Sequence, residues 1–345
     1  MKIKTIKKIL KLKIEDWTNS VNDNDVKKAI KDGAIVTGGS IASLLLREDV
    51  NDFDIYFKTK ETLMTVCKYY CEGNDIQVWD GDRAKIEYDK IEQETKDFQE
   101  KNGGMGFDEN KSRLATFLKD IEPNRVKLFV GHLGHKRIDP LDYKKNITDN
   151  TVLPYQPAFF SPNAISLTDK LQIVIRFWGP VEGIHKNYDF VHATNYYDVS
   201  ENNLVLKDRA MESLLTKELY YVGSLYPLTS VIRAKKFIQR GWTITAGSYL
   251  KICFQVSKLD LEDIKVLEEQ LIGVDIAYFS TLVDILKVKK ENNPDFVPTY
   301  EWLAELIDKV FDGDEEDRET TPEKDENVAS FGQGYVNGDG VDLDT

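Results

Sequence analysis

Two aspartates separated by one residue form the first pattern in this sequence that could do chemistry. Asp52 and Asp54 flank Phe53, and strand-like residues follow them to Phe57. Because side chains alternate between the two faces of a strand, both carboxylates must point the same way, with Phe53 directed toward a core. Two carboxylates about 6 to 7 Å apart repel each other unless a cation lies between them. The pair is typical of a Mg²⁺ site, which uses one or two carboxylates plus phosphate oxygens.

A glycine turn lies upstream of the acidic pair. Gly38, Gly39 and Ser40 follow an apolar, β-branched run at residues 34–37, and a helix-like stretch at residues 41–47 comes next. At such a turn the backbone can approach a phosphate, and the N-terminus of the helix favours negative charge. Ser40 is placed to cap that helix or to donate its hydroxyl to a phosphate oxygen. The sequence therefore predicts a phosphate site beside a metal site.

In this order, the two motifs resemble the signature of the nucleotidyltransferase superfamily related to DNA polymerase β. That signature is a hydrophobic strand, Gly-[Gly/Ser], a helix, and a strand bearing Asp-hydrophobic-Asp, and residues 35–40 and 52–55 match it. The resemblance covers residues 25 to 197, interrupted by a charged insertion. It implies an α+β fold, in which a polymerase β-like head with a mixed sheet and flanking helices is followed by a mainly helical domain.

The family has a third acid on a later strand, and we assign this role to Asp189. Residues 164–190 look like a form of the fold seen in viral and phage nucleotidyltransferase-like proteins. In that form an aromatic-Asp-Phe unit supplies the acid after an Ile-Gln-Ile-Val-like strand, and Tyr188-Asp189-Phe190 matches the unit. Asp198 and Asp139 are the alternatives. The other interpretation of Asp189 is an ordinary loop acid.

The resemblance implies transfer of a nucleoside monophosphate from an NTP to an acceptor hydroxyl by a two-metal mechanism. Asp52 and Asp54 would hold both Mg²⁺ (or Mn²⁺) ions. Asp189 would complete the first ion's ligands and help to remove the acceptor proton, and the glycine turn would hold the triphosphate.

A basic helical face is predicted further along the chain. Arg233, Lys236 and Arg240 recur at spacings of three and four residues. Residues 233–242 are similar to the Arg-x-x-Arg-Phe helix that follows the head in tRNA CCA-adding and poly(A) polymerases, with Lys236 replacing the second arginine. The face suits RNA or the NTP triphosphate; a solvated face with Phe237 in the core is the alternative. No Arg-Arg-Asp-Phe-like segment and no Glu-Asp-x-x-Arg template is present, so CCA specificity is not implied.

Composition and charge narrow the class of protein. Of the 345 residues, 41% are hydrophobic and 30% charged, which is ample for a large core or two modest ones. No apolar run approaches the roughly 20 residues that cross a bilayer, so we expect no membrane association and a cytoplasmic location, in the host cytoplasm if the protein is viral. Three cysteines indicate neither a disulfide framework nor a zinc cluster.

The formal net charge is −13, but residues 312–345 hold −10 of it, so a nucleic-acid partner is not excluded.

Patterning along the chain predicts four regions. Residues 1–24 form a basic amphipathic helix that docks on the head or touches RNA phosphates or an anionic surface. The head spans 25–203, with helices and loops inserted at about 80–123, and a helical domain spans 204–312, where we predict no strand. We predict that residues 313–345 form a disordered acidic tail. This tail either keeps the protein in solution or serves as a docking peptide for a protein partner.

The remaining histidines carry weaker hypotheses. His132 and His135 could be half of a zinc site, or two exposed histidines in a turn. His192 could touch phosphate, or be buried.

Two functions from different classes follow. The first is a metal-dependent, template-independent nucleotidyltransferase, with an RNA 3′ end as the preferred acceptor and a protein or small molecule as the other acceptor classes. The second is a catalytically inactive protein of the same fold that serves as a binding or virion-associated protein.

Overall fold

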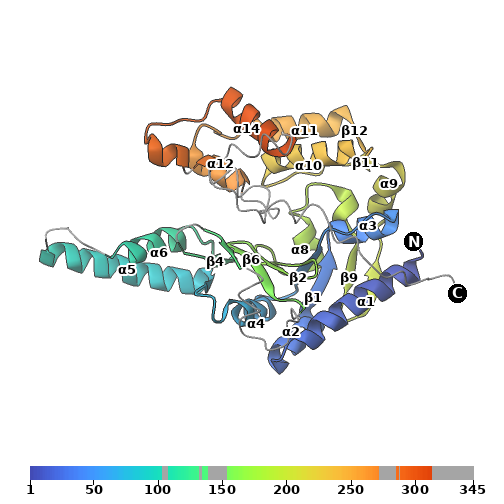
Figure 1. Ribbon diagram of the computed structural model, residues 1–345, viewed down its shortest axis with the longest axis horizontal. Helices are drawn as coiled ribbons and strands as arrows, with labels where there is room; N and C mark the ends of the chain where they lie inside the picture. The colour runs from blue at the N-terminus through green and yellow to red at the C-terminus, as the bar shows by residue number, and fades with distance from the viewer. Residues whose placement is uncertain (103–107, 132–133, 139–153, 272–284, 287, 313–345) are drawn as a thin grey trace.

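The computed structural model describes residues 1–102, 108–131, 134–138, 154–271, 285–286 and 288–312. A mixed sheet lies at its centre, with strands in the order β10-β9-β1-β2-β8-β7-β6-β5. Helices pack on both faces of this sheet, and a mainly helical part follows it (Figure 1). The predicted fold class, an α+β head followed by a helical region, is confirmed.

The central strand of the head is β2 (Phe53–Phe57). It pairs antiparallel with β1 (Ala34–Thr37) on one side and parallel with β8 (Leu171–Val174) on the other. All other neighbours in this sheet are antiparallel. The other strands are β5 (Lys136–Arg137), β6 (Pro157–Ser161), β7 (Ala164–Leu167), β9 (Tyr196–Asp198) and β10 (Asn203–Val205).

The largest core lies on one face of the sheet, under three helices: α1 (Ile3–Ser20), α2 (Asn24–Gly33) and α4 (Lys60–Cys71). Helix α1 buries Ile6, Leu10, Ile14 and Trp17, and the Trp17 indole donates a hydrogen bond to the Tyr70 hydroxyl at 2.7 Å. The N-terminal helix therefore docks on the head through its apolar stripe. Residues of β2 that point to this face, Phe53, Ile55 and Phe57, are all buried.

The opposite face carries Asp54 and is covered in part by α8 (Val181–His185). A smaller cluster here joins Ile35, Tyr56 and Val174 of the sheet to Val181 and Ile184 of the helix. Helix α3 (Gly39–Leu46) starts at the end of β1 and packs against the 3-10 helix η1 (Val191–Thr194). These elements frame the end of β1 and the beginning of β2.

The charged insertion forms an arm. Strands β3 (Gln77–Asp80) and β4 (Val126–Phe129) pair at its base, and α5 (Gly81–Asn102) and α6 (Glu109–Lys119) project from them to one side of the molecule (Figure 1). The two helices have a small core of their own, made of Ala84, Ile91, Leu118 and Ile121. The helices predicted in the insertion are present, and β3, just before it, is a strand that the sequence analysis did not predict.

The helical part comprises α9 (Asp208–Thr216), α10 (Pro227–Gln239), α11 (Ala246–Val256), α12 (Ile264–Leu271) and α14 (Tyr300–Asp312). The expectation that no strand follows residue 204 was wrong, because β11 (Glu218–Leu219) and β12 (Thr243–Ile244) form a short parallel pair. Strands of two residues leave no alternation in the sequence to recognise. In the described ranges, no helix has the length and apolarity that a membrane span needs. The acidic tail, residues 313–345, lies outside the described residues.

Candidate active site

The glycine turn and Asp54 are in direct contact. Gly38 has a φ of 102°, a conformation that suits glycine, and a Cβ on this residue would collide with the Asp54 carboxylate. Strand pairing explains the contact, because Asp54 lies opposite Thr37, the residue before Gly38. The backbone N–H of Gly38 donates to the carbonyl of Ala193 at 3.1 Å and fixes the turn to η1. The glycine turn and Asp54 are therefore adjacent in the fold, as the sequence predicted.

The N-terminus of α3 has no side-chain cap. Its N-cap residue is Gly38, which has no side chain to accept from the first N–H groups of the helix. A Cβ on Gly39 would meet nothing within 4 Å, so open space adjoins the turn. The Ser40 hydroxyl is buried, at 2% exposure, and has no hydrogen-bond partner in the described part of the chain. These groups could donate to phosphate oxygens.

Asp52 precedes β2, two residues before Asp54, and both residues are half-buried. Phe53 between them is 7% exposed and belongs to the core on the far face, as the alternation predicted. Carboxylate oxygens are the ligands that Mg²⁺ takes together with phosphate, so this donor set fits the metal. Within the described ranges, no group of three or more His, Cys, Asp or Glu side chains is arranged to hold a metal ion.

Gln172 is a site residue that the sequence analysis missed. It lies opposite Asp54 in the parallel β2–β8 pair, so the two side chains lie on the same face of the sheet. Its Oε1 atom is buried and has no hydrogen-bond partner in the described part of the chain. Register between strands distant in sequence could have identified it, but a single sequence does not reveal that register.

Two tyrosines line the same face. Tyr56 follows Asp54 by two residues, and its ring lies 6.1 Å from that of Tyr188. Burial, and then the neighbouring Tyr188 and Asp54, raise the pKa of the Tyr56 hydroxyl well above its ordinary value. Burial and then Asp54 raise the pKa of Tyr188 in the same way. Both hydroxyls therefore stay protonated beside the Asp54 carboxylate.

A directed chain of hydrogen bonds holds the end of β1. The Lys207 ammonium can only donate, so His185 accepts at Nδ1 (2.8 Å) and presents Nε2–H to Thr37 Oγ1 (2.9 Å). The Thr37 hydroxyl then donates to the carbonyl of Asn195 at 2.9 Å. Burial, and then Lys207, lower the pKa of His185 to about 3, so the imidazole is neutral. This network fixes the residue that precedes Gly38.

Asp189 is directed toward α10. Its Oδ2 atom accepts from Arg233 Nη1 at 3.0 Å and from the Ser230 hydroxyl at 3.1 Å, and its Oδ1 accepts from the N–H of Phe190. The residue is 8% exposed. Arg233 lies close enough to Tyr56 and Tyr188 to lower the pKa of both, while Asp54 raises it. Asp189 is therefore linked to the surroundings of Asp54 through its ion pair with Arg233.

The alternatives to Asp189 differ in environment. Asp198 on β9 pairs with Lys58 at 2.7 Å and lies opposite Ile35, toward the other end of β1 from the glycine turn. Although burial alone raises the pKa of Asp198, hydrogen bonds from Lys58, Ser200 and the N–H of Glu201 lower it overall. The Asp198 carboxylate is therefore held by Lys58 in this structure. Asp139 lies outside the described residues.

The three residues of the predicted basic face, Arg233, Lys236 and Arg240, differ in exposure and in the groups they contact. Arg233 and Lys236 lie on α10 and are half-buried, while Arg240 is the exposed C-cap residue of that helix. Arg233 turns to Asp189, and the Arg240 guanidinium lies 6.0 Å from the ring centre of Phe237. Phe237 packs on His192 and Trp242, as the core interpretation of that residue predicted.

His192 is buried, at 2% exposure, and sits among aromatic rings. Burial lowers its pKa to about 4, although Asp189 acts in the opposite direction. His135 stacks on Phe159, and His132, its proposed partner in a zinc site, lies outside the described residues.

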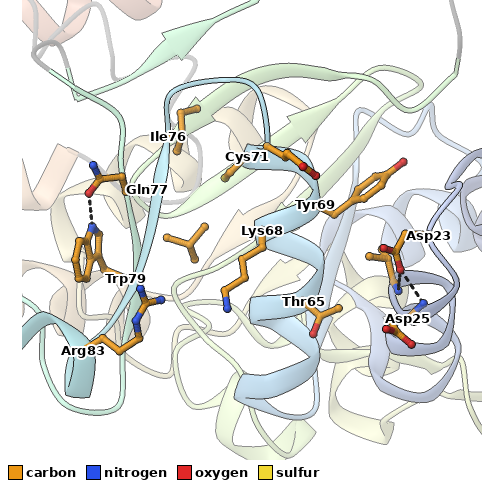
Figure 2. Close-up of a pocket in the computed structure, with 13 residues that line it drawn as sticks. Asp23, Asp25, Thr65, Lys68, Tyr69, Cys71, Ile76, Gln77, Trp79 and Arg83 are labelled. Carbon is orange, nitrogen blue, oxygen red and sulfur yellow. Dashed lines mark hydrogen bonds between the residues drawn. The ribbon is translucent and has the colours of Figure 1, made fainter.

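An open hollow lies apart from these residues, between α2, α4 and β3 (Figure 2). Lys68, Trp79 and Arg83 line it, and the Trp79 indole donates to Gln77 Oε1 at 3.1 Å. None of the predicted site residues contributes to its wall.

The fold thus brings the glycine turn after β1, the start of α3 and Asp54 of β2 together at one end of the sheet, with Asp52 just before β2. The chain belongs to the Gabija anti-defense 2 family, Gad2, whose model matches residues 8–217. The match includes α1, the sheet and the glycine turn, and it ends just after α9. No curated protein matches the chain.

Solved structures that resemble the chain include CCA-adding enzymes. The Thermotoga maritima CCA-adding enzyme complexed with tRNA is 12% identical at a TM-score of 0.34, over 92% of this chain and 71% of that one. The Bacillus stearothermophilus CCA-adding enzyme in complex with CTP is 10% identical at a TM-score of 0.34, over 78% and 51%. A tRNA nucleotidyltransferase with a primer tRNA and an ATP analogue is 12% identical at 0.32, over 78% and 61%. The tRNA and nucleotides belong to those proteins.

Proposed function

We propose that this protein is a metal-dependent nucleotidyltransferase that moves a nucleoside monophosphate from an NTP to an acceptor hydroxyl. The observation that carries the proposal is the contact between Gly38 and the Asp54 carboxylate. It brings a helix N-terminus suited to phosphate and a carboxylate suited to a divalent cation to one point. An NTP carries both of the groups that such a point would bind, a polyphosphate and its bound metal.

Each residue of the turn has a distinct task in this proposal. Gly38 keeps the backbone close to Asp54, and Gly39 leaves the space in which the triphosphate lies. The buried Ser40 hydroxyl, which has no partner in the described part of the chain, donates to a phosphate oxygen. Asp52 and Asp54 would hold Mg²⁺, which stabilises negative charge on the reacting phosphate and on the leaving pyrophosphate. The chain in turn holds the nucleotide in line with its acceptor.

The role of Asp189 as a third metal ligand stays a prediction. In this structure its carboxylate binds Arg233 and Ser230. We therefore assign the metal to Asp52 and Asp54 and assign Arg233, held by Asp189, to the triphosphate. Lys236 and Arg240 extend the positive charge of α10 beyond Arg233.

Family membership gives the reaction a setting. The description of the family as anti-defense suggests that the acceptor is a component of a defence system. We place an RNA 3′ end first among acceptors and a protein hydroxyl second. Transfer would add a nucleotide, with its phosphate charge, to either acceptor.

The test uses the full-length protein, α-labelled NTPs and Mg²⁺, with total RNA and host-cell protein as separate acceptors. The wild type should transfer label, and Asp54→Asn should reduce the rate on the order of a thousandfold or more. Asp49→Asn, an exposed acid three residues before Asp52, is the matched control and should retain activity. Absence of labelling in every acceptor class would refute the enzyme proposal.

A second candidate function is a binding protein that holds a nucleotide without transferring it. Two observations favour it: Asp189 is engaged by Arg233, and the residue beside Asp54 on β8 is the neutral Gln172. Calorimetric titration with Mg²⁺ and a non-hydrolysable NTP distinguishes the two candidates. Binding that Asp54→Asn abolishes, together with no labelling of any acceptor, would support the binding protein.

A further inference from the structure

The exposed side of α1 carries a stripe of lysines. Lys4, Lys8 and Lys11 follow a spacing of four and then three residues, so they lie one above the other on one side of the helix. All three are exposed, and the buried residues Ile6 and Leu10 lie on the opposite side. We call Lys4, Lys8 and Lys11 the lysine stripe.

This placement of charge does not stabilise the helix. The N-terminus of a helix has a partial positive charge and favours acidic residues, yet the first turn of α1 has none and its N-cap, Lys2, makes no side-chain capping bond. Lysines three and four residues apart also repel each other. Lys11 pairs with Glu15 at 3.6 Å, whereas in the described ranges no acid lies within ion-pair distance of Lys4 or Lys8.

Two lysines on α5, by contrast, each have an acidic neighbour. On α5, Lys90 pairs with Glu87 at 3.5 Å and Lys96 pairs with Glu92 at 3.6 Å. The whole chain has a formal net charge of −13. Because −10 of that charge lies in residues 312–345, the lysines of α1 belong to a nearly neutral part of the chain, where a local run of positive charge suits an anionic partner.

We propose that the lysine stripe binds the phosphate backbone of a nucleic acid strand. At a rise of 1.5 Å per residue, the stripe is about 10 Å long. Successive phosphates on a strand are about 3.4 Å apart along a duplex axis, so the stripe spans about three of them. Lysine ammonium groups bind phosphates as point charges and do not read bases, so binding is independent of sequence.

A membrane surface fits this helix less well. Amphipathic helices that lie on membranes insert their apolar face between lipids. In α1 that face is buried against the head, because Ile6, Leu10 and Trp17 are each 0% exposed. The apolar residues left exposed on α1, Ile3 and Leu12, flank the lysine stripe and do not form a continuous apolar face.

The position of α1 relates the stripe to the candidate active site. Helix α1 contacts α3, the helix that begins at the glycine turn. Helix α3 has eight residues and is therefore about 12 Å long. A nucleic acid strand bound to the lysine stripe can extend toward that site. The inference does not depend on the proposed function, because binding is measured without NTP.

The test is fluorescence anisotropy of the full-length protein with labelled single-stranded RNA, single-stranded DNA and duplex DNA, between 50 and 200 mM salt. The triple variant Lys4→Gln/Lys8→Gln/Lys11→Gln should bind single strands about tenfold more weakly at low salt. Its slope of log affinity against log salt should be shallower by about 2, since each phosphate contact contributes about 0.7. Comparison of the three ligands identifies the preferred form of nucleic acid.

The matched control is Lys85→Gln/Lys90→Gln/Lys96→Gln, which removes the same charge from exposed positions of α5. It should bind like the wild type, and both triple variants should melt no lower than the wild type. Equal affinity and equal slope for the two triple variants would overturn the proposal. So would binding to phosphatidylserine vesicles without binding to any of the three nucleic acids.

Discussion

In the proposed metal site, Gln172 would be the neutral neighbour of Asp54. Its neutral amide lies beside Asp54, and its carbonyl oxygen is buried with no partner in the described part of the chain. A buried, unsatisfied carbonyl costs about 1 to 3 kcal/mol, and a cation would satisfy it. The site therefore has two formal charges from Asp52 and Asp54 and one neutral oxygen.

Substitution of this residue tests the arrangement. Gln172→Glu should lower the melting temperature without metal, because it adds a third carboxylate, and should gain more stability from Mg²⁺ than the wild type does. Gln172→Leu, which removes the polar atom, is the control and should gain less. Thermal melts with and without Mg²⁺ measure both. Identical gains in all three proteins would show that residue 172 does not face the metal.

His192 makes stability depend on pH. Its pKa is lowered to about 4 by burial, whereas in the unfolded chain it is about 6.5, so below that pH the unfolded state takes up a proton that the folded state does not. Stability therefore falls as the pH falls from 7 to 5.5, by about 1 kcal/mol for this residue.

His192→Phe, which suits the surrounding aromatic rings, should remove that part of the pH dependence. Denaturant unfolding at pH 7 and 5.5 measures it. His135→Gln, at a partly exposed histidine, is the control and should leave the dependence unchanged. If His192→Phe loses as much stability as the wild type over this range, His192 is not the cause.

At the scale of elements, the turn between β1 and α3 depends on one glycine more than the other. Gly38 combines a φ of 102° with contact to Asp54, whereas a Cβ on Gly39 meets open space. Gly38→Ala should therefore lower the free energy of unfolding by roughly 1 to 3 kcal/mol and abolish nucleotide binding, because Asp54 is displaced. Gly39→Ala should fold normally. Chemical denaturation and calorimetric titration measure the two effects, and equal behaviour of the two variants would contradict the prediction.

The elements that sequence predicts best are those that hold the site. The run at residues 34–37 is β1 as predicted, and the helix-like stretch at residues 41–47 is α3, which begins at Gly39 and ends at Leu46. Both have many apolar residues whose period is visible locally. Strand β9 was not predicted. Its three residues, Tyr196 to Asp198, form a strand because they pair with β1, which is distant in sequence. Likewise, the partners of Asp189 and Gln172 depend on contacts with α10 and β2, which are distant in sequence.

At the scale of the whole molecule, Arg176 joins the head to the helical part. It follows β8, and its guanidinium lies 4.1 Å from the ring centre of Tyr226, at the start of α10, and 3.9 Å from Glu269 of α12. Burial, and then Arg125, lower its pKa to about 10. Its charge is thus desolvated at the junction and is stabilised there by the ring and by Glu269.

Arg176→Met should weaken this junction. We expect the helical part to melt at a lower temperature than the head, so that calorimetry shows two transitions or a broadened one. Arg113→Met, an exposed arginine on the arm, is the control and should leave the trace unchanged. A single, unshifted transition for Arg176→Met would show that other contacts hold the junction.

The pairing of β2 also has a consequence for synthesis. One edge of this strand bonds β8, which begins at Leu171, although β2 itself ends at Phe57. At typical translation rates, on the order of ten seconds separate the emergence of the two strands from the ribosome. During that interval the strand that bears Asp54 has an open edge, because a nascent chain that ends before Leu171 lacks its parallel partner. The candidate site is therefore incomplete until most of the head has been made.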